Sequence, residues 1–415
     1  MNEQQRIVIT GIGVVSPNAL GAANFELACR RGVSGLSQID GFDTGAIKSR
    51  IAGVVRDFDP AGVMDPVDVR RVPRLIPLAV AASKEAIAQA RLTIGSDSIA
   101  LSRRTGVALG TGGGGLEFVE EQYRRIHQGG KRSPFAITAG THGNLSSEIS
   151  IQLKLRGPSH VISTGCASST DAIGHAMMTL RAGAADVMIA GGADACIAPG
   201  ILGAFEMLGV ISTREFADPT KASRPFNRDR DGFILGEGAW MFVVETLDHA
   251  RRRGATPLAE IAGYASTCDA YHRVQIAPDL EECTRAIEES LAAAGASADE
   301  VDYVNLHGTG TQLNDRLETA AIRRVMGERA DKIPMSATKS LIGHPQGAGG
   351  AAGIAATVLA MHSGWVHPTI NLTDPDPQCD LDYVPGVARA HAISCALCNC
   401  IAFGSKNSAL VVRRI

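Results

Sequence analysis

One cysteine of the chain stands where a catalytic nucleophile would be expected. Cys166 lies in the small-residue run Ser-Thr-Gly-Cys-Ala-Ser-Ser, residues 163–169, directly after a short apolar stretch. Apolar residues then recur at positions 173, 176, 177 and 180, which is the spacing of a helix. A thiol at the start of a helix lies near the positive end of the helix dipole, which favours the reactive thiolate. The alternative is a small buried hydrophobic side chain, the commoner role of a single cysteine.

Two histidines far downstream favour the catalytic interpretation of Cys166. His307 lies in Asn-Leu-His-Gly-Thr-Gly-Thr, and His344 lies in Lys-Ser-Leu-Ile-Gly-His-Pro, which begins at Lys339. Each histidine follows an apolar run and has a glycine beside it. A cysteine combined with histidines that are distant in sequence is typical of nucleophilic catalysis.

These residues resemble the Cys-His-His set, with its associated lysine, of the β-ketoacyl-acyl-carrier-protein synthases. Members of that family are the condensing enzymes of fatty acid and polyketide synthesis, and the resemblance extends over almost the whole chain. Its other motifs are VITGIGVVSP at residues 8–17, SRPF at 223–226, DGFILGEG at 231–238 and FGSKN at 403–407. Several motifs in the family's order make the match specific, whereas any one of them alone would be a weak signal.

The resemblance implies a decarboxylative condensation and assigns a role to each of the four residues. Cys166 would hold the growing acyl chain as a thioester. His307 and His344 would donate hydrogen bonds to the thioester oxygen of a malonyl group, which loses carbon dioxide. Lys339 would shape the local electric field and orient a histidine, because the loss of carbon dioxide needs no base stronger than imidazole.

Further positions are implied as supports for this chemistry. The backbone N–H of Cys166 and a second backbone N–H, which maps to Ile401, would bind the oxyanion of the tetrahedral intermediate. Asp315 and Glu318 match an acidic pair of the family and would support Lys339 and the active-site loop. The alternative for both carboxylates is an exposed position at the start of a helix, where negative charge is also favourable.

A glycine-rich run, Gly-Thr-Gly-Gly-Gly-Gly at residues 110–115, invites comparison with phosphate-binding loops. It lacks the Gly-Lys-Ser/Thr ending of a P-loop and the context of a dinucleotide-binding fingerprint. We therefore interpret it as a close-packed turn and predict no cofactor. In the family this segment borders the acyl pocket, so the resemblance places Gly112 and Gly113 there, together with Phe403.

The chain departs from the fatty-acid synthases of the family near the acyl pocket. Ile401 stands where they have a phenylalanine gate, and residues 401–407 read Ile-Ala-Phe-Gly-Ser-Lys-Asn in place of Phe-Gly-Phe-Gly-Gly-x-Asn. Gly353 replaces a glutamate that usually follows the second histidine by nine positions, and glycine there is similar to modular polyketide ketosynthases. These differences favour a specialised type II polyketide or polyene pathway. The alternative is a housekeeping 3-oxoacyl-acyl-carrier-protein synthase II of fatty acid synthesis.

Two other classes of function compete with a malonyl-dependent condensing enzyme. A thiolase-type acyltransferase that uses coenzyme A would have a second catalytic cysteine near the C-terminus, and Cys395, Cys398 and Cys400 are candidates. The pair of histidines argues against that class. A non-catalytic scaffold, such as the chain-length-factor homologues that lack the nucleophile, is disfavoured by the presence of Cys166.

Composition and charge exclude several further classes. The 415 residues are 45% hydrophobic and have a net charge of -3, which excludes a strongly basic nucleic-acid-binding protein. The nine cysteines show no regular pairing, so a secreted disulfide framework is not expected. Cys-Ala-Leu-Cys at residues 395–398 has no second ligand pair for a zinc ribbon, and we predict no metal site.

The expected environment is the cytoplasm. The N-terminus is polar and does not resemble a signal peptide, and the longest uncharged run of small residues, 347–361, is shorter than the ~20 residues needed to span a bilayer. The resemblance implies an acyl carrier protein as the partner that delivers acyl and malonyl groups. It also implies a homodimer, or a heterodimer with a chain-length-factor-like homologue. No nucleic acid or membrane partner is expected.

Alternating strand-like and helix-like runs predict an α/β fold. In the first part of the chain, strands are expected at 6–11, 105–109, 160–163, 186–190 and 240–245, with helices at 78–90 and 170–182. In the second part, strands are expected at 259–265, 301–306, 333–336, 396–403 and 408–412, with helices at 284–294 and 349–361.

No proline- or serine-rich linker separates the two series of elements. We therefore expect two packed halves, residues 1–255 with the nucleophile and residues 256–415 with the two histidines. The resemblance implies the thiolase-like architecture, in which helices and sheets alternate in five layers, αβαβα, with two pseudo-equivalent halves. Internal identity is too low for this duplication to be seen in the sequence.

Overall fold

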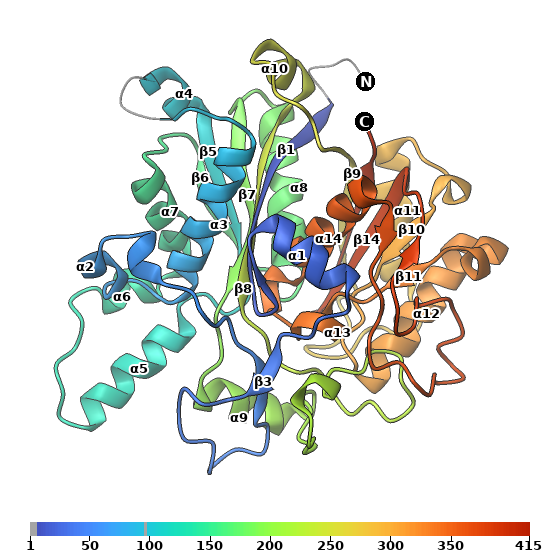
Figure 1. Ribbon diagram of the computed structural model, residues 1–415, viewed down its shortest axis with the longest axis horizontal. Helices are drawn as coiled ribbons and strands as arrows, with labels where there is room; N and C mark the ends of the chain where they lie inside the picture. Colours follow the sequence, from blue (N-terminus) through green and yellow to red (C-terminus); the bar gives the residue numbers. More distant parts are fainter. Residues whose placement is uncertain (1–5, 95–97) are drawn as a thin grey trace.

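The computed structural model describes residues 6–94 and 98–415 of the chain. Its central feature is a sheet of 11 strands that is covered by helices (Figure 1). Residues 1–5, on which the expectation about a signal peptide rests, and residues 95–97 lie outside the described part.

The strands of this sheet come from two successive stretches of the chain. The first stretch contributes β1 (Ile7–Ser16), β2 (Ala19–Leu20), β5 (Thr105–Gly110), β6 (Ser159–Ile162), β7 (Val187–Asp194) and β8 (Gly238–Thr246). The second contributes β9 (Ala259–Cys268), β10 (Tyr303–Asn305), β11 (Met335–Ser336), β14 (Cys395–Ala402) and β15 (Lys406–Arg413). Two separate pairs are β3 (Leu36–Gln38) with β4 (Ile51–Gly53), and β12 (Trp365–Val366) with β13 (Arg389–Ala390).

Both stretches arrange their strands in the same order. Across the sheet the first stretch runs β6-β5-β7-β8-β1, and the second runs β11-β10-β14-β15-β9. In each set the first three strands are parallel, and each later strand is antiparallel to its neighbour. The equivalent strands β1 and β9 pair antiparallel and join the two sets. The duplication that cannot be seen in the sequence is therefore visible in the topology.

Helices form three layers, with the two sets of strands between them (Figure 1). At the left of the view, α3 (Leu75–Gln89) and α7 (Leu145–Leu153) cover the outer face of the first set. In the middle, α8 (Ser168–Arg181) and α14 (Gly349–Ser363) lie between the two sets. At the right, α11 (Glu281–Ala294) covers the second set, with α12 (Gln312–Met326) beside it. The five-layered, thiolase-like architecture is confirmed.

Further helices surround these layers and connect the strands. They are α1 (Ala22–Arg30), α2 (Pro66–Val69), α4 (Ile99–Arg104), α5 (Leu116–His127), α6 (Ala136–Gly140), α9 (Pro199–Leu208), α10 (Leu247–Arg252) and α13 (Lys339–Ile342). The last of them, α13, directly precedes the segment that contains His344.

Close contact between strands and helices explains part of the high glycine content of the chain. In β1, a Cβ atom at Gly13 would lie 1.8 Å from the carbonyl oxygen of Ala82 on α3. In the equivalent strand β9, a Cβ atom at Gly263 would lie 2.1 Å from the carbonyl oxygen of Ser290 on α11. Because both separations are far below van der Waals contact, each helix can lie on its strand only where the strand has glycine.

α14 occupies the centre of the molecule and is buried on almost all sides. It contains most of the uncharged run 347–361, which the sequence predicts to be a tightly packed core helix. Within the described ranges, no helix is both long enough and apolar enough to cross a bilayer.

Every strand and helix predicted from the sequence is present, with small shifts at the ends. The predicted helix at 284–294 is α11, and Gly295 ends it in the left-handed conformation with a φ of 59°. β1 extends beyond residue 11 to Ser16, because its glycines face α3 and do not interrupt the strand. The division between residues 255 and 256 falls in the loop between α10 and β9, and it stays a prediction.

Candidate active site

Cys166 lies in a tight turn between β6 and α8. Gly165 precedes it with a φ of 64°, a left-handed conformation that glycine adopts without strain. The hydroxyl of Ser168 closes the turn, because it donates to the carbonyl oxygen of Gly165 and accepts from the N–H of Thr164. α8 begins at Ser168, so Cys166 stands two residues before the first helical residue, close to the predicted helix start.

His344 approaches Cys166 from the second half of the chain. Its backbone N–H donates to the carbonyl oxygen of Ile234 at 2.7 Å, and its own carbonyl accepts from the N–H of Gly236 at 3.0 Å. These bonds fix the histidine against the segment that leads into β8. The ring nitrogen Nε2 lies 3.1 Å from the Cys166 sulfur, and the ring packs edge-on against Phe233 with centroids 5.1 Å apart.

His307 follows β10, and a buried carboxylate holds its backbone. Glu318 accepts hydrogen bonds from the N–H groups of His307 and Gly308, at 2.7 and 2.8 Å, and from the amide of Asn399 at 2.8 Å. Glu318 and Asp315 are both fully buried, so the alternative of exposed carboxylates at a helix start is wrong. Burial raises the pKa of Glu318, while the three donors act in the opposite direction.

The thiol and the two imidazoles form one buried cluster. The sulfur of Cys166 and ring nitrogens of His307 and His344 lie within 4.8 Å of one another, and the two rings are in T-shaped contact with centroids 5.5 Å apart. A thiol with two imidazoles could also bind a soft divalent cation such as zinc, which would block the thiol. No other group of three such ligands with this spacing occurs in the described ranges.

Lys339 is one of the groups that influence which nitrogen of His307 bears the ring proton. Its ammonium donates to the carbonyl oxygen of His307 at 2.6 Å and lies 3.4 Å from the ring nitrogen Nδ1. A proton on Nδ1 would point at this donor, so Nδ1 acts as an acceptor and the proton lies on Nε2. Burial lowers the pKa of His307 well below its ordinary value, and Lys339 and His344 lower it further. The ring is therefore neutral and presents an N–H.

His344 is neutral for the same reason, because burial and the charge of Lys339 lower its pKa well below the ordinary value. Its Nδ1 is buried without a hydrogen-bond partner. An unpaired N–H donor is costlier to bury than an acceptor with a free lone pair, so the ring proton lies on Nε2. Both histidines thus direct a neutral N–H donor into the site.

The thiol of Cys166 is protonated at neutral pH. Burial raises its pKa to about 11, although the charge of Lys339 and the backbone N–H of Phe403 act in the opposite direction. The expectation that the helix dipole favours the thiolate is corrected, because the loss of water around the sulfur outweighs the nearby positive groups. The sulfur must lose its proton as it attacks, and the Nε2–H of His344 is placed to stabilise the anion that forms.

The second backbone N–H that faces the sulfur belongs to Phe403. It lowers the pKa of the Cys166 thiol, as does the N–H of Cys166 itself. Ile401 lies two residues earlier, inside the ladder between β14 and β15, opposite Asn407. The assignment of the second oxyanion donor to Ile401 stays a prediction, and the N–H of Phe403 is a second candidate. The turn after β14 brings the later N–H to the sulfur, and Ile401 contributes its side chain to the cavity wall.

A cavity of about 310 Å³ opens beside Cys166, a volume typical of small-molecule sites. Its apolar wall includes Phe233, Val274, Ile276, Ile401 and Phe403. Its polar wall includes Thr309 and Thr311, from the loop between β10 and α12, and Gln312 and Asn314, from the first turn of α12. The cavity therefore combines an apolar surface with polar groups at one side, and the reactive cluster lies at its wall.

Gly112 and Gly113, expected beside the acyl pocket, do not line this cavity and instead bind a buried carboxylate. Asp194, at the end of β7, accepts from the hydroxyl of Thr111 at 2.8 Å and from the N–H groups of Gly112, Gly113 and Gly347 at 2.7, 3.1 and 2.7 Å. Burial raises the pKa of Asp194, while these donors lower it. Asp194 thus ties the glycine-rich loop to the segment before α14.

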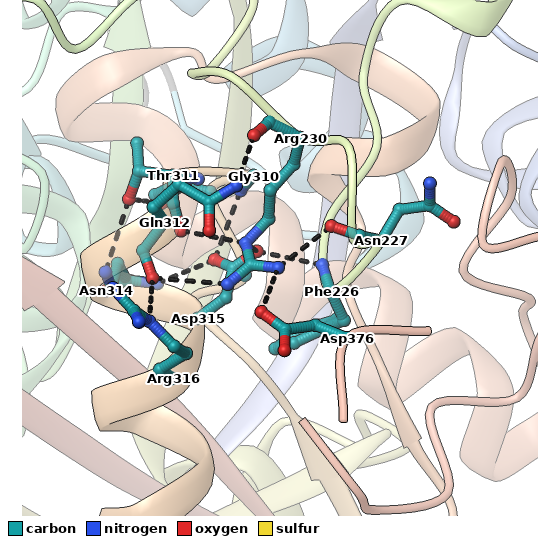
Figure 2. Close-up of polar contacts among 12 residues, drawn as sticks. Phe226, Asn227, Arg230, Gly310, Thr311, Gln312, Asn314, Asp315, Arg316 and Asp376 are labelled. Carbon is teal, nitrogen blue, oxygen red and sulfur yellow. Dashed lines mark hydrogen bonds and ion pairs between the residues drawn. The ribbon is translucent and has the colours of Figure 1, made fainter. Parts of the chain in front are cut away.

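Arg230 is the centre of a second buried network, shown in Figure 2. Its guanidinium is fully buried and lies between two carboxylates, 3.2 Å from Asp315 and 2.8 Å from Asp376. It also donates to three carbonyl oxygens, those of Asn227, Thr311 and Gln312. Breaking a buried pair of this kind by removing one partner typically costs about 3–5 kcal/mol.

Asp315 extends this network to the cavity wall. It accepts from the N–H groups of Phe226 and Gly310, at 2.8 and 3.2 Å, and from the amide of Asn314 at 3.2 Å (Figure 2). The network therefore joins the loop before β8, the start of α12 and the loop before β13. Because Asn314 lines the cavity, the buried charges fix the shape of its polar wall.

Sequence reasoning missed the positions of Asp194, Arg230 and the N–H of Phe403. Asp194 ends an apolar run, and a carboxylate at the carboxyl end of a buried strand is a signal that could have been used. Arg230 stands in Asn-Arg-Asp-Arg-Asp, where the spacing does not distinguish the buried residue from the exposed ones. The N–H of Phe403 could not be recognised from the residue type, because every residue except proline has a backbone N–H.

Family comparisons match both halves of the chain. Residues 4–250 match the model of the beta-ketoacyl synthase N-terminal domain, and residues 258–373 match that of its C-terminal domain. The 3-oxoacyl-[acyl-carrier-protein] synthase 2 of Coxiella burnetii is 40% identical over 415 residues, which cover 100% of this chain and 99% of the relative. The tetracenomycin polyketide synthase ketoacyl synthase alpha subunit of Streptomyces glaucescens is 40% identical over 421 residues, 99% of this chain and 97% of the relative.

Solved structures of ketosynthases also match the chain over almost its whole length. One is a type II polyketide synthase acyl-carrier protein in complex with its ketosynthase bound to the hexaketide. It matches with a TM-score of 0.89 and 34% identity over 99% of both chains. The ishigamide ketosynthase/chain length factor matches with a TM-score of 0.89 and 32% identity over 99% of both chains.

Fold and site together define a thiolase-like acyltransferase. The chain belongs to the β-ketoacyl synthase family, and it is a condensing enzyme that forms β-ketoacyl thioesters.

We predict that iodoacetamide alkylates Cys166 slowly at neutral pH and about tenfold faster for each pH unit up to roughly pH 10. Only the thiolate reacts, and burial raises the pKa of this thiol to about 11. Peptide mass spectrometry of timed samples gives the rate at each pH. The exposed Cys268 serves as an internal control, and Cys166→Ala identifies the signal. A rate that levels off below about pH 8 would contradict the raised pKa.

Proposed function

We propose that this condensing enzyme uses Cys166 as its nucleophile and joins a malonyl unit to the acyl group held there, in a specialised type II polyketide or polyene pathway. The main support for the nucleophile is its position. The Cys166 sulfur lies at the wall of a cavity, 3.1 Å from Nε2 of His344, and the backbone N–H groups of Cys166 and Phe403 lower the pKa of its thiol.

In the loading step an acyl group passes from a carrier thiol to Cys166. The sulfur attacks the thioester carbon, the bond from that carbon to the carrier sulfur breaks, and the thiol proton ends on the departing carrier. The N–H groups of Cys166 and Phe403 bind the oxyanion of the tetrahedral intermediate, since both already lower the pKa of the thiol. Such preorganised donors typically contribute about 3 kcal/mol each to stabilisation of the transition state.

In the second step a malonyl thioester enters the cavity and loses carbon dioxide. The electron pair of the broken carbon–carbon bond forms an enolate, and the Nε2–H groups of His307 and His344 donate to its oxygen. The enolate carbon then attacks the acyl carbon on Cys166, and the cysteine sulfur leaves and regains a proton. The product is a thioester that is longer by two carbons and bears a 3-oxo group.

Lys339 acts through His307, because it contacts that histidine's carbonyl oxygen and ring. Asp315 and Glu318 act one step further away by fixing the loop that contains His307 and the cavity wall. No step of this scheme uses a metal or an organic cofactor.

We infer that an acyl carrier protein delivers both thioesters and that the protein works as a dimer. One structural relative was solved as a carrier protein with its ketosynthase, and another as a ketosynthase/chain length factor. In this chain β6 forms a free edge of the sheet, and α7 and α8 beside it expose Ile151 and Met178. An edge strand flanked by exposed apolar side chains suits pairing with a second copy or a homologous chain.

The pathway is proposed from two positions near the site. Ile401 lines the cavity where fatty-acid synthases of the family have phenylalanine. A Cβ atom at Gly353 would lie 2.2 Å from the side-chain oxygen of Asn305, so no carboxylate fits at position 353 without rearrangement. Housekeeping fatty acid synthesis is the second candidate, because the relatives named for the two pathways are both 40% identical to this chain.

Neither the thiolase-type nor the scaffold function has equal support. Cys395, Cys398 and Cys400 are buried on β14, and none of them lines the cavity as a second catalytic cysteine would. A scaffold has no need of a thiol and two neutral imidazoles in mutual contact. All nine cysteines are free, which supports our proposal of a reducing compartment, the cytoplasm.

The first prediction tests the nucleophile. Cys166→Ala should abolish acyl loading, because no other cysteine lies at the cavity. Cys398→Ala and Cys400→Ala should retain most of it. Intact-mass measurement after incubation with acyl-carrier-protein substrates counts the acyl groups bound, and loading of Cys166→Ala at the wild-type level would exclude the assignment.

A second prediction distinguishes the role of the two histidines in decarboxylation from the role of the nucleophile in acyl loading. His307→Ala and His344→Ala should still accept an acyl group on Cys166 but release carbon dioxide from malonyl carrier protein roughly 100-fold more slowly, since each loses one donor to the enolate. Release of labelled carbon dioxide measures this step directly. Normal decarboxylation by both variants would count against the proposed role.

Ile401→Phe tests the pathway. We expect the wild-type protein to use unsaturated or polyketide-like acyl carrier proteins better than saturated long-chain ones. The preference should be graded, because a pocket discriminates by only ~1–3 kcal/mol per methylene-sized difference. Ile401→Phe should narrow or shift this range, because a ring can swing and a β-branched side chain cannot. Ile401→Val is the matched control. Equal kcat/KM on saturated chains, unchanged in Ile401→Phe, would favour the housekeeping function.

A further inference from the structure

Cys400 lies next to the active site but outside the cavity. It is on β14, is almost completely buried and does not line the cavity wall. Its sulfur lies 3.1 Å from the carbonyl oxygen of Cys166 and 3.4 Å from Nδ1 of His307. One thiol therefore contacts both the backbone of the nucleophile and the ring of a histidine that presents its other nitrogen to the substrate.

The Cys400 thiol has fewer hydrogens than it has acceptors, which restricts the hydrogen bonds that it can donate. A thiol has one hydrogen to donate, and burial raises the pKa of Cys400, so that hydrogen is present at neutral pH. Nδ1 of His307 is an acceptor, because a proton there would face the ammonium of Lys339. The single thiol hydrogen is therefore shared between the carbonyl oxygen of Cys166 and Nδ1 of His307.

Lys339 does not make the thiol redundant. Its closest contact is the carbonyl oxygen of His307 at 2.6 Å, while its distance to Nδ1 is 3.4 Å. Because sulfur is a larger atom than nitrogen, 3.4 Å is an ordinary hydrogen-bond length for the thiol of Cys400 and a long one for the amine. The thiol is thus a second donor within reach of the ring nitrogen, beside the ammonium of Lys339.

We propose that Cys400 is a positioning residue of the condensation, whose thiol keeps Nδ1 of His307 an acceptor and so holds the ring proton on Nε2, facing the malonyl thioester. The inference rests on the proposed function, because it assumes that His307 donates to the enolate. Cys400 touches no substrate. It acts only through His307 and through the carbonyl group of Cys166.

Other groups around His307 also influence its titration. The titratable and charged side chains that face it are Cys166 in the turn before α8, Glu318 on α12, Lys339 on α13, His344 before α14 and Cys400 on β14. Of these, only Lys339 and Cys400 contact Nδ1. A change at Cys400 therefore alters the environment of that nitrogen and leaves the other four groups in place.

The test compares Cys400→Ala and Cys400→Ser with a control on the same strand. Cys398→Ala removes an equally buried thiol whose partner is the hydroxyl of Thr357, away from the cluster. For each full-length protein we would measure acyl loading by intact mass, and the kcat and KM for release of carbon dioxide from malonyl carrier protein across a range of pH. Thermal unfolding checks that every variant is folded.

Cys400→Ala should still load the acyl group, and its kcat for decarboxylation should fall about tenfold with little change in KM, the effect expected for one lost hydrogen bond. Loss of the donor makes Nδ1 easier to protonate, which raises the pKa of His307, so the acid limb of the pH profile should move to higher pH. Cys400→Ser keeps one donor hydrogen and should restore the wild-type profile and most of the rate. Cys398→Ala should resemble the wild type.

Three results would overturn the inference. One is a kcat for decarboxylation by Cys400→Ala that equals the wild-type value across the pH range. Another is a fall in kcat without a shift of the acid limb, which would indicate a merely structural effect. The third is failure of Cys400→Ser to restore the profile although the protein is folded. If the wild-type protein itself neither loads an acyl group nor releases carbon dioxide, the proposed function fails and not only the role of Cys400.

Discussion

Removal of water from the active site is the constraint on which its chemistry depends. Burial raises the pKa of Cys166 and lowers the pKa values of His307 and His344, so all three groups are held in their neutral forms. Neutral imidazoles can donate hydrogen bonds to an enolate without protonating its carbon, which must remain free to attack the acyl group. The same exclusion of water makes the Cys166 thiol a weak nucleophile until hydrogen-bond donors around it stabilise the thiolate anion.

Burial also explains why carboxylates hold the irregular parts of the site. Glu318 binds the turn at His307, Asp194 binds the glycine-rich loop, and Asp315 binds the cavity wall, in each case through backbone N–H groups. A loop has backbone donors that no strand or helix satisfies, and a buried carboxylate must be hydrogen-bonded to be tolerated. The backbone donors of a loop and the oxygens of a buried carboxylate therefore satisfy each other, and these hydrogen bonds hold the loop in place.

The parts of the site that could be predicted from the sequence are those in which the residue type itself does the chemistry. Cys166 and the two histidines stand out because thiol and imidazole groups are rare among small and apolar neighbours. The N–H of Phe403 could not be predicted, since every residue except proline has one and only the turn after β14 directs it to the sulfur. Ile401, the donor that the resemblance implies, lies two residues earlier on β14, and its role stays a prediction.

Strands and helices could be predicted because their hydrophobic periodicity is local in the sequence. The contact between the two halves could not, because it joins residues that are far apart in the sequence. The repeated strand order places corresponding loops of both halves at one site. Cys166 follows β6, the outermost strand of its set, and leads into α8, and His344 follows β11, the outermost strand of the other set, and leads into α14. His307 follows the second strand of its set, as the glycine-rich loop does in the first half. Nucleophile and donor thus occupy equivalent positions of a duplicated fold, and the two central helices bring them into contact.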